Sequence, residues 1–536
     1  MSDRINTGAN PDYFLDSASG AFVAGKTLSS FGDVKRIMAN AAEKNFENGL
    51  VLHFHGGLVK RQYALDNIVL PLTTGYLQHA KAYPLFFVWQ SGFVETLINN
   101  KGELLKDPTF RELVKKVTEF AIKKTSLAKH LMVRGPDGTS IENVKNFREK
   151  YDRWFDGHET NPPVPDPELG IARSAAPLPV VRASAPNVGE LELEVLNSIQ
   201  GDPAFKDAFA QAYNAIVPQN AAHVPTRSAS AGNTLNSENI LLSETTINEI
   251  FPRPFGPTPN TNVRGIFDLY KVAKYVTKII LAVLKRFREN RDHGVYCTVV
   301  EEVLRNAFFD LVGTNVWNQM KNDTLQSFSD EQFSGAAVVN ELKAMHGQGL
   351  DRVTLVGHST GAIYICNFLD AAKKAGIPMD KWQVIFLAPA VTCQRFAQAI
   401  KDHGSTGLRN FRMFAMKDAL ESQDTLVPIL YTRSLLYFVS GLLEGAPNGD
   451  GWDGVLDMPL VGMQRFVDGN QNFQEDEAVQ TVLNFLRSPD NPNRVVWSAT
   501  HVAEEGLSSA ASKHGDFDND ELTLASLYQL ISTAEV

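Results

Sequence analysis

Short apolar runs, most of which end in glycine or alanine, recur along this chain and constrain its fold more than any other feature. The first run, at 49–57, reads Gly-Leu-Val-Leu-His-Phe-His-Gly-Gly, and helical patterns separate the later runs. Buried parallel strands have this continuous apolar character because helices cover both faces of their sheet. The pattern therefore predicts an α/β fold with a mostly parallel sheet and helices on both faces. The predicted strands lie at 49–57, 84–92, 352–357, 383–388, 410–416 and 494–499.

A long segment between the second and third predicted strands does not follow this alternation. It contains Pro- and Ser-rich stretches, whose compositions favour extended or mobile chain. These stretches lie at 161–167, 175–179 and 226–232. Helical patterns at 108–124 and 267–290 surround them. We therefore expect a mainly α-helical cap insertion at 96–328 with poorly ordered loops, and the two parts of the α/β core at 1–95 and 329–536.

Composition bounds the classes of partner and the compartment. The 536 residues include 51 Lys and Arg against 61 Asp and Glu, a formal net charge of −10, so the chain lacks an overall basic field and we expect no nucleic-acid partner. Three scattered cysteines, Cys297, Cys366 and Cys393, are too few for a disulfide framework and indicate a reducing compartment. The N-terminus is polar, and no apolar run approaches the ~20 residues that span a bilayer. We expect a cytoplasmic protein without a transmembrane segment, which leaves room for peripheral membrane contact.

The strongest chemical signal is the sequence Gly-His-Ser-Thr-Gly at 357–361. It directly follows a predicted strand and directly precedes an amphipathic helical pattern, which is the context of a nucleophile elbow. The turn there is so tight that side chains two residues either side of the serine would collide, and this explains the two glycines. The serine hydroxyl is then exposed at the start of a helix, whose positive end favours an oxyanion. The pattern therefore indicates that Ser359 is a nucleophile.

A second motif, His-Phe-His-Gly-Gly at 53–57, ends the first predicted strand. With this motif and the elbow, the chain resembles the α/β-hydrolase superfamily of serine esterases and lipases, over roughly residues 49–92 and 350–536. In that family a turn of H-G-G type supplies one N–H of the oxyanion hole, and the residue after the nucleophile supplies the other. The resemblance implies that Gly57, or its neighbour Leu58, and Thr360 form the oxyanion hole. We interpret His53 and His55 as groups that orient the turn, not as catalytic bases.

The family order of serine, then acid, then histidine implies a base after the last strand. Two histidines qualify, His501 and His514. His501 lies at the very end of the last predicted strand, whereas His514 lies in a polar loop before the final helical pattern. Because that loop position suits an imidazole that reaches the elbow, we prefer His514.

The acid should follow the strand at 410–416. Asp418 comes soonest after that strand, and we prefer it. Asp424 belongs to a D-x-x-V-P arrangement that also occurs in the family, but it could equally cap a helix predicted at 426–443. Glu421 is a third candidate. The acid would hold the imidazole in the right tautomer and stabilise the imidazolium that forms.

These residues imply a serine hydrolase that cleaves carboxylic esters through a Ser-His-Asp triad and an acyl-enzyme intermediate. The substrate would be a small-molecule or lipid ester. Neither H-E-x-x-H nor a ligand-spaced Cys/His set occurs, so we expect no metal and no cofactor.

Two alternatives remain open. One is a lipase or phospholipase that acts at a membrane surface, because the pattern at 267–290 is apolar on one side and basic on the other, although packing against a core explains it as well. The other is a non-catalytic binding or regulatory protein on the same scaffold. An apolar acyl pocket could come from 437–443 with Trp89, Phe93, Trp317 and Trp452, but aromatic residues at such spacing are more often core.

Overall fold

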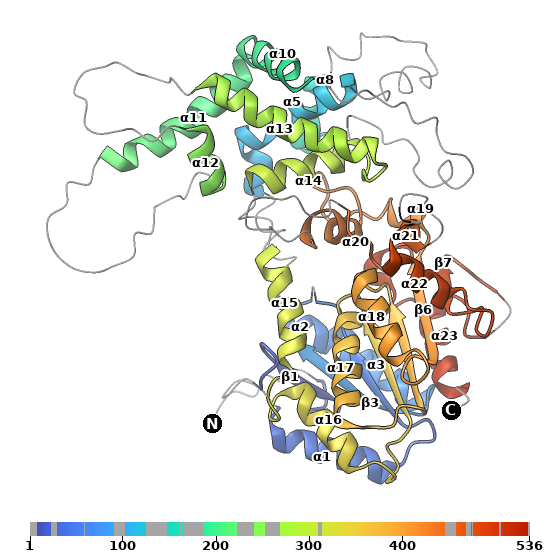
Figure 1. Ribbon diagram of the computed structural model, residues 1–536. Coiled ribbons are helices and arrows are strands. Elements are labelled where there is room, and N and C mark those ends of the chain that lie inside the picture. The colour runs from blue at the N-terminus through green and yellow to red at the C-terminus, as the bar shows by residue number, and fades with distance from the viewer. Residues whose placement is uncertain are drawn as a thin grey trace, which may run out of the picture. The chain divides into compact units, whose positions relative to one another are not determined.

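The apolar runs form one seven-stranded sheet in the computed structural model, and every strand pairing in it is parallel (Figure 1). The strand order is β1-β3-β2-β4-β5-β6-β7. The strands are β1 (Phe14–Ser17), β2 (Leu50–Phe54), β3 (Tyr83–Trp89), β4 (Val353–His358), β5 (Trp382–Leu387), β6 (Asn410–Met416) and β7 (Val495–Ser498). All six predicted strands are confirmed, and β1 is an additional strand that the sequence pattern did not predict.

The structure describes part of the chain, and every structural statement refers to that part. The described residues are 8–22, 29–57, 59–89, 102–124, 147–159, 163, 187–221, 241–251, 268–308, 314–444, 457–467, 473, 475–502 and 505–533. The Pro- and Ser-rich segments expected to be poorly ordered lie outside these residues, Pro163 excepted. Leu58, Phe93 and Trp452 also lie outside them.

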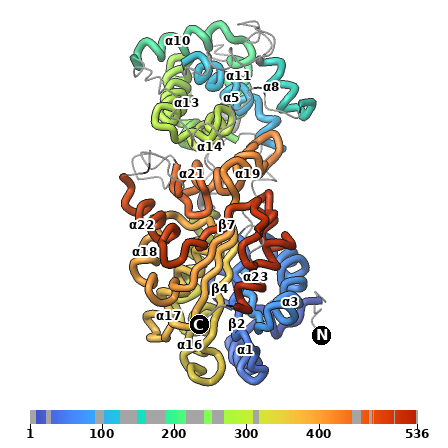
Figure 2. The backbone as a smooth tube through the Cα atoms, turned by 90° about the vertical axis from the view of Figure 1, so that its right-hand side faces the viewer, coloured from blue at the N-terminus to red at the C-terminus, as the bar shows by residue number. Residues whose placement is uncertain are grey.

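Helices cover both faces of the sheet (Figure 2). On one face α17 (Gly361–Ala375) packs through Phe368 against Phe54, Phe87 and Trp382. On the other face the α2–η1–α3 segment (61–78) and α23 (Glu521–Thr533) pack on a cluster that includes Val356 and other strand residues. The sheet is therefore apolar on both sides, which is why its strands read as continuous apolar runs.

The helices that belong with the sheet are mostly short, and several begin at a polar capping residue. Ser30, Thr392 and Asp476, for example, each accept a hydrogen bond from a backbone N–H in the first turn. These helices are α1 (Phe31–Lys44), α2 (Arg61–Ala64), η1 (Leu65–Val69), α3 (Leu70–Gln78), α15 (Thr314–Gln326), α16 (Ser334–Ala344), α17 (Gly361–Ala375), α18 (Cys393–His403), α19 (Asp418–Glu421), α20 (Leu435–Phe438), η3 (Val439–Leu443), α21 (Gln464–Val467), α22 (Glu477–Leu486), η5 (His514–Asp516) and α23 (Glu521–Thr533).

Contacts divide the chain into two units. The first unit contains the sheet and comprises 1–95, 314–425 and 433–536, whereas the second comprises 96–313 and 426–432. The described elements of the second unit are all helices: α5 (Pro108–Lys124), α8 (Phe147–Phe155), α10 (Val188–Gln200), α11 (Pro203–Ala221), α12 (Glu244–Ile250), α13 (Leu269–Arg288) and α14 (Val295–Ala307). The second unit thus differs from the expected insertion at 96–328, because α15 packs with the sheet unit and a short later segment joins the helices.

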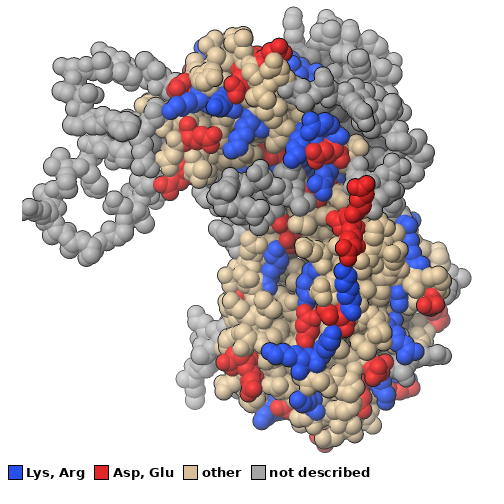
Figure 3. Space-filling view, in the orientation of Figure 1, with Lys and Arg blue, Asp and Glu red and all other residues tan. Residues whose placement is uncertain are grey.

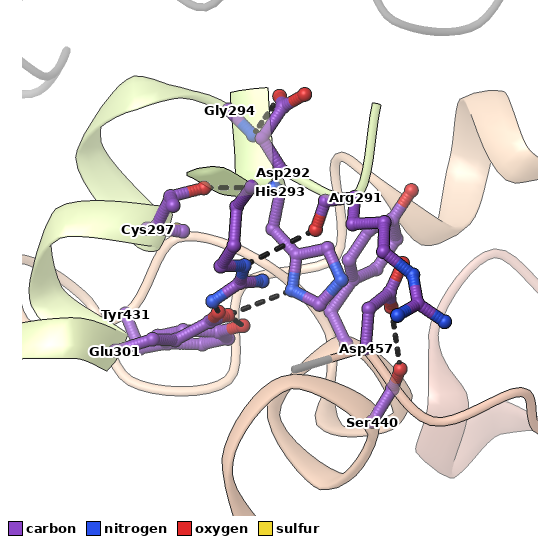
Figure 4. Close-up of polar contacts among 12 residues, drawn as sticks. Arg291, Asp292, His293, Gly294, Cys297, Glu301, Tyr431, Ser440 and Asp457 are labelled. Carbon is purple, nitrogen blue, oxygen red and sulfur yellow. Dashed lines mark hydrogen bonds and ion pairs between the residues drawn. The ribbon is translucent and has the colours of Figure 1, made fainter. Parts of the chain in front are cut away.

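A buried ionic cluster in the second unit holds the segment 426–432 (Figure 4). Arg286 of α13 pairs with Glu301 of α14, and His293 Nδ1 lies 2.8 Å from Glu301 Oε1. The hydroxyl of Tyr431 donates a hydrogen bond to the same carboxylate. Burial alone would raise the pKa of Glu301, but the neighbouring Arg286 and His293 lower it to about 2. Segment 426–432 is therefore fixed by polar contacts and is not part of the helix predicted at 426–443, which begins only at Leu435.

The amphipathic helix predicted at 267–290 is α13, and its apolar side is buried within the second unit. Val276, Ile279 and Ile280 are fully covered, and α13 packs on α5, α10, α12 and α14. The apolar side is therefore occupied by the unit's own core. On the face that Figure 3 shows, Lys and Arg side chains are interspersed with Asp and Glu. Among the described residues, no helix has the length and apolar character needed to cross a membrane.

The aromatic residues considered for an acyl pocket are core residues where the structure describes them. Trp89, Trp317 and the 437–443 segment are buried. Trp317 also donates its indole N–H to Glu444 over 2.9 Å. These side chains therefore stabilise the sheet unit and do not mark a pocket by themselves.

Candidate active site

The predicted nucleophile lies in a strained turn between β4 and α17. Ser359 has a φ of +54°, a left-handed conformation that costs a residue with a Cβ about 1–3 kcal/mol. Its N–H donates to Leu387 O over 2.9 Å, and its C=O accepts from Ala390 N–H over 3.1 Å. These two bonds to the end of β5 and the turn beyond it hold the serine in place.

Gly357 and Gly361, at either end of the elbow, have no room for a side chain because backbone atoms lie too close to them. A Cβ on Gly357 would lie 2.8 Å from the carbonyl carbon of Gly361. A Cβ on Gly361 would lie 3.0 Å from the carbonyl carbon of Phe54 on β2 and closer still to its oxygen. Because β2 and β4 are paired neighbours with Phe54 opposite Gly357, the elbow packs directly against the end of β2. This is the close contact that the Gly-x-Ser-x-Gly pattern predicts.

The two predicted oxyanion residues are brought together at this edge of the sheet. The N–H of Gly57 donates to Oγ1 of Thr360 over 2.5 Å. A Cβ on the adjacent Gly56 would lie 3.4 Å from the Cβ of Ser359, so the whole Gly-Gly turn faces the nucleophile. Among the described residues, none accepts a hydrogen bond from the backbone N–H of Thr360. The alternative donor, Leu58, lies outside the described residues.

His514 is buried beside the elbow, whereas His501 is exposed just after β7. The carbonyl of His514 accepts a hydrogen bond from Nε2 of His358 over 3.0 Å, and the two rings stack with centroids 5.2 Å apart. Within the described part of the chain, Ser359 Oγ and both ring nitrogens of His514 have no hydrogen-bond partner, so the two side chains are not bonded to each other. Burial, followed by the positive charge of His358, lowers the pKa of His514 to about 3, and the ring is neutral at pH 7.

Among the three acid candidates, the structure connects Asp424 to the histidine. Asp424 Oδ2 accepts the backbone N–H of His514 over 2.9 Å. Burial raises the pKa of Asp424, and this hydrogen bond partly counteracts the effect. The bond reaches the backbone of His514 and not its imidazole.

The preferred acid, Asp418, has other partners. Its Oδ1 accepts the hydroxyl of Tyr437 over 2.7 Å, and no contact in the described chain joins it to His514. Glu421 is buried, accepts the hydroxyl of Ser434, and has a pKa well above its ordinary range, chiefly through burial. These contacts change the preferred acid from Asp418 to Asp424. Asp418 is closer in sequence to the end of β6, but its carboxylate contacts Tyr437 and not the histidine.

The two histidines of the His-Phe-His-Gly-Gly motif are both buried; both ring nitrogens of His55 are hydrogen-bonded, whereas only Nδ1 of His53 has a partner among the described residues. His55 Nδ1 donates to Gly56 O over 2.6 Å, and its Nε2 accepts the N–H of Trp89 over 3.2 Å. His53 Nδ1 and the Tyr76 hydroxyl form a hydrogen bond of 2.8 Å. Burial lowers the pKa of His55 to about 4 and that of His53 to about 3. These contacts favour the interpretation that both residues orient the turn.

Two residues of the site were not identified from the sequence. His358 is the variable residue of the Gly-x-Ser-x-Gly pattern, and Asp518 lies four residues after His514. Asp518 Oδ2 lies 3.4 Å from His358 Nδ1 in a largely buried ion pair. The sequence signal that could have identified them is a histidine directly before the elbow serine together with an aspartate shortly after His514.

The comparisons with known proteins leave the assignment to the geometry. No protein-family model matches the chain, and no curated protein or solved structure is similar to it at a significant level. Among the described residues, no group of three or more His, Cys, Asp or Glu side chains is arranged to hold a metal ion.

Proposed function

We propose that this protein is a serine hydrolase of the α/β-hydrolase type that cleaves carboxylic esters through an acyl-enzyme intermediate. The observation that carries the proposal is Ser359 itself. Its backbone is held at a φ of +54° between a parallel strand and a helix, and its Oγ has no partner among the described residues. Strain of this kind persists where the surrounding structure enforces it, and it is concentrated at functional sites.

In this mechanism Ser359 Oγ attacks the ester carbonyl while His514 accepts its proton. His514 then returns that proton to the leaving alcohol, and the acyl group remains on the serine. A water molecule, deprotonated by the same imidazole, attacks the acyl-enzyme and releases the carboxylic acid. His514 suits the role of base because it is neutral at pH 7 and both of its ring nitrogens are unpartnered among the described residues. Catalytic hydrogen bonds are often long or absent before substrate binds.

The oxyanion would be stabilised where Gly57 meets Thr360. The Thr360 N–H lies at the start of α17, whose positive end favours negative charge. The Thr360 hydroxyl accepts the Gly57 N–H, so its own proton is available to donate to the developing oxyanion. This arrangement supports an oxyanion hole in which the Thr360 hydroxyl, oriented by the Gly57 N–H, adds to the backbone N–H of Thr360.

Asp424 is the acid that the geometry supports best, because it already binds the residue that carries the imidazole. Its carboxylate would stabilise the imidazolium that forms during attack.

Hydrolysis of p-nitrophenyl acetate and of longer acyl esters tests the proposal. We expect wild type to turn over these esters and Ser359→Ala to lose turnover by a factor of about 10⁴ or more. His514→Ala should lose turnover to a similar extent, whereas the matched control His501→Ala should not. Asp424→Asn should retain less ester turnover than Asp418→Asn. Turnover that persists in Ser359→Ala, or wild type that is inert on every ester, contradicts the proposal and favours the non-catalytic alternative.

A further inference from the structure

His358 makes two polar contacts to the loop that carries the proposed base. Its Nε2 donates to His514 O over 3.0 Å, and its Nδ1 faces Asp518 Oδ2 at 3.4 Å. Its ring also stacks on the ring of His514 with centroids 5.2 Å apart. One side chain of the elbow thus contacts the backbone, the ring and the far end of the 514–518 turn.

The three contacts converge from an element that cannot move easily. His358 is the last residue of β4, and its neighbour Ser359 is fixed by bonds to Leu387 and Ala390. Asp518 lies in the turn before α23, and this turn is held by Asp516, which accepts the N–H groups of Ser512 and Lys513. The pair therefore adds a direct link between the rigid end of the nucleophile strand and a loop that Asp424, the buried Phe517 and the loop's own turn bonds also hold.

We propose that His358 and Asp518 are positioning residues that fix the imidazole of His514 beside Ser359 and keep it in its neutral, proton-accepting form. This inference rests on the proposed hydrolase function. His358 touches neither substrate nor the reacting atoms in this account, and it acts through His514 alone.

The charges around the two rings set the expected pH dependence. His358 lies against His514 and Asp518. His53 approaches from β2 and His55 from the turn that follows it, while Asp424 approaches His514 from the loop after β6. Burial lowers the pKa of His358, but Asp518 and the bond to His514 O outweigh it and raise that pKa above its ordinary value. A charged His358 opposes protonation of His514, and this effect is larger than the opposite effect of Asp518.

Two substitutions separate geometry from charge. His358→Phe keeps an aromatic ring for stacking but removes both polar contacts. Asp518→Asn keeps a hydrogen-bond partner for Nδ1 but removes the negative charge that raises the pKa of His358. The matched control is His403→Phe. His403, the last residue of α18, is also buried and pairs at 2.7 Å with Asp370, which lies about two and a half turns along α17 from the elbow.

Steady-state hydrolysis of p-nitrophenyl acetate gives the first readout. We expect His358→Phe to lower kcat by about 10–100-fold with little change in KM, since misplacement of the base affects the transition state and not substrate binding. The acid limb of the pH profile should move upward, so that activity at about pH 5 relative to about pH 8 falls most in His358→Phe and less in Asp518→Asn. His403→Phe should leave both quantities near wild type. Equal kcat and pH profiles in His358→Phe and His403→Phe would overturn the inference.

An NMR titration gives a readout that does not require activity. Histidine labelled with carbon-13 at Cε1 reports the pKa of each ring, and His514→Gln identifies the His514 signal among the 12 histidines. We expect the pKa of His514 to rise in His358→Phe and to stay unchanged in His403→Phe. An unchanged His514 signal in His358→Phe overturns the inference even if the enzyme is active. If wild type hydrolyses no ester while the His514 pKa still responds, the hydrolase proposal fails and the positioning role stands.

Discussion

The N–H of Gly57 donates a 2.5 Å hydrogen bond to Oγ1 of Thr360, although the two residues are 303 positions apart in the chain. The pairing of β2 with β4 produces this contact, because Phe54 lies opposite Gly357 and the turns that follow both strands meet at the carboxyl edge of the sheet. Ligands of open α/β sheets bind at that edge. The relationship places the Thr360 hydroxyl, held by the Gly57 N–H, and the N-terminus of α17 beside Ser359.

The Thr360 hydroxyl should contribute to catalysis. We predict that Thr360→Val lowers kcat for ester hydrolysis by about 10²-fold or more, since it removes one oxyanion donor and leaves the Gly57 N–H without its partner. Thr360→Ser keeps the hydroxyl and should retain most activity. Steady-state kinetics on p-nitrophenyl acetate compare the three proteins. Higher activity in Thr360→Val than in wild type would show instead that the hydroxyl blocks the oxyanion site.

Gly57 should tolerate no side chain, whereas Gly56 should tolerate a small one. A Cβ on Gly57 would lie 2.9 Å from Met320 Sδ and nearer still to Thr360 Oγ1, while the nearest atom to a Cβ on Gly56 is 3.4 Å away. We therefore predict that Gly57→Ala displaces the turn and loses at least tenfold in kcat, and that Gly56→Ala stays closer to wild type. Circular dichroism of both variants serves as the folding control. Equal activities would mean that the turn adjusts without cost.

Acidification should destabilise the protein before it protonates the site. Burial lowers the pKa values of His53, His55 and His514 to about 3, 4 and 3, whereas the unfolded chain binds these protons near 6.5. Stability is therefore fully present above about pH 6.5 and falls as the pH drops toward 4, by about 1.4 kcal/mol for each pH unit and each such histidine. His358 offsets part of this loss because its pKa is raised.

Thermal unfolding from pH 7 to 4 measures this dependence. Replacement of His53 by Gln should reduce the fall in Tm, because one fewer proton is taken up on unfolding. Replacement of the exposed His501 by Gln is the matched control and should leave the slope unchanged. A Tm that is constant across this range would contradict the burial of neutral histidines.

The ionic cluster of the second unit should depend on Glu301. Replacement of Glu301 by Gln leaves the buried Arg286 without its full counter-charge, and we predict a loss of about 3–5 kcal/mol in stability. Tyr431→Phe removes only the hydroxyl that donates to that carboxylate, and it should cost about 1–2 kcal/mol. Urea unfolding followed by tryptophan fluorescence compares the two variants. The reverse order of effects would place the main stabilisation of segment 426–432 elsewhere.

The sheet could be predicted from the sequence because parallel strands buried on both faces leave long apolar runs. The exception is β1, whose four residues, Phe14–Ser17, include Asp16, so they read as polar chain. Asp16 is buried nonetheless, because it pairs with Arg61 at the start of α2. A long-range ion pair of this kind leaves no periodic signal.

The site could be predicted in part. The elbow and the Gly-Gly turn have local patterns, and the structure brings Ser359, Gly57 and Thr360 together as those patterns imply. The acid could not be ranked from spacing alone, because the path of the chain after β6 decides whether Asp418 or Asp424 meets His514. The pair of His358 and Asp518 depends on how α23 and its preceding turn fold back on β4, and no short motif records that contact.

Labelling with a fluorophosphonate probe, followed by peptide mapping, tests the central claim most directly. The reagent forms a stable adduct only with a serine that is activated by a base and supported by an oxyanion hole. We predict one adduct, on the peptide that contains Ser359, and its loss in Ser359→Ala and in His514→Ala. An unlabelled wild-type protein, or an adduct that persists when Ser359 is replaced, would contradict the account.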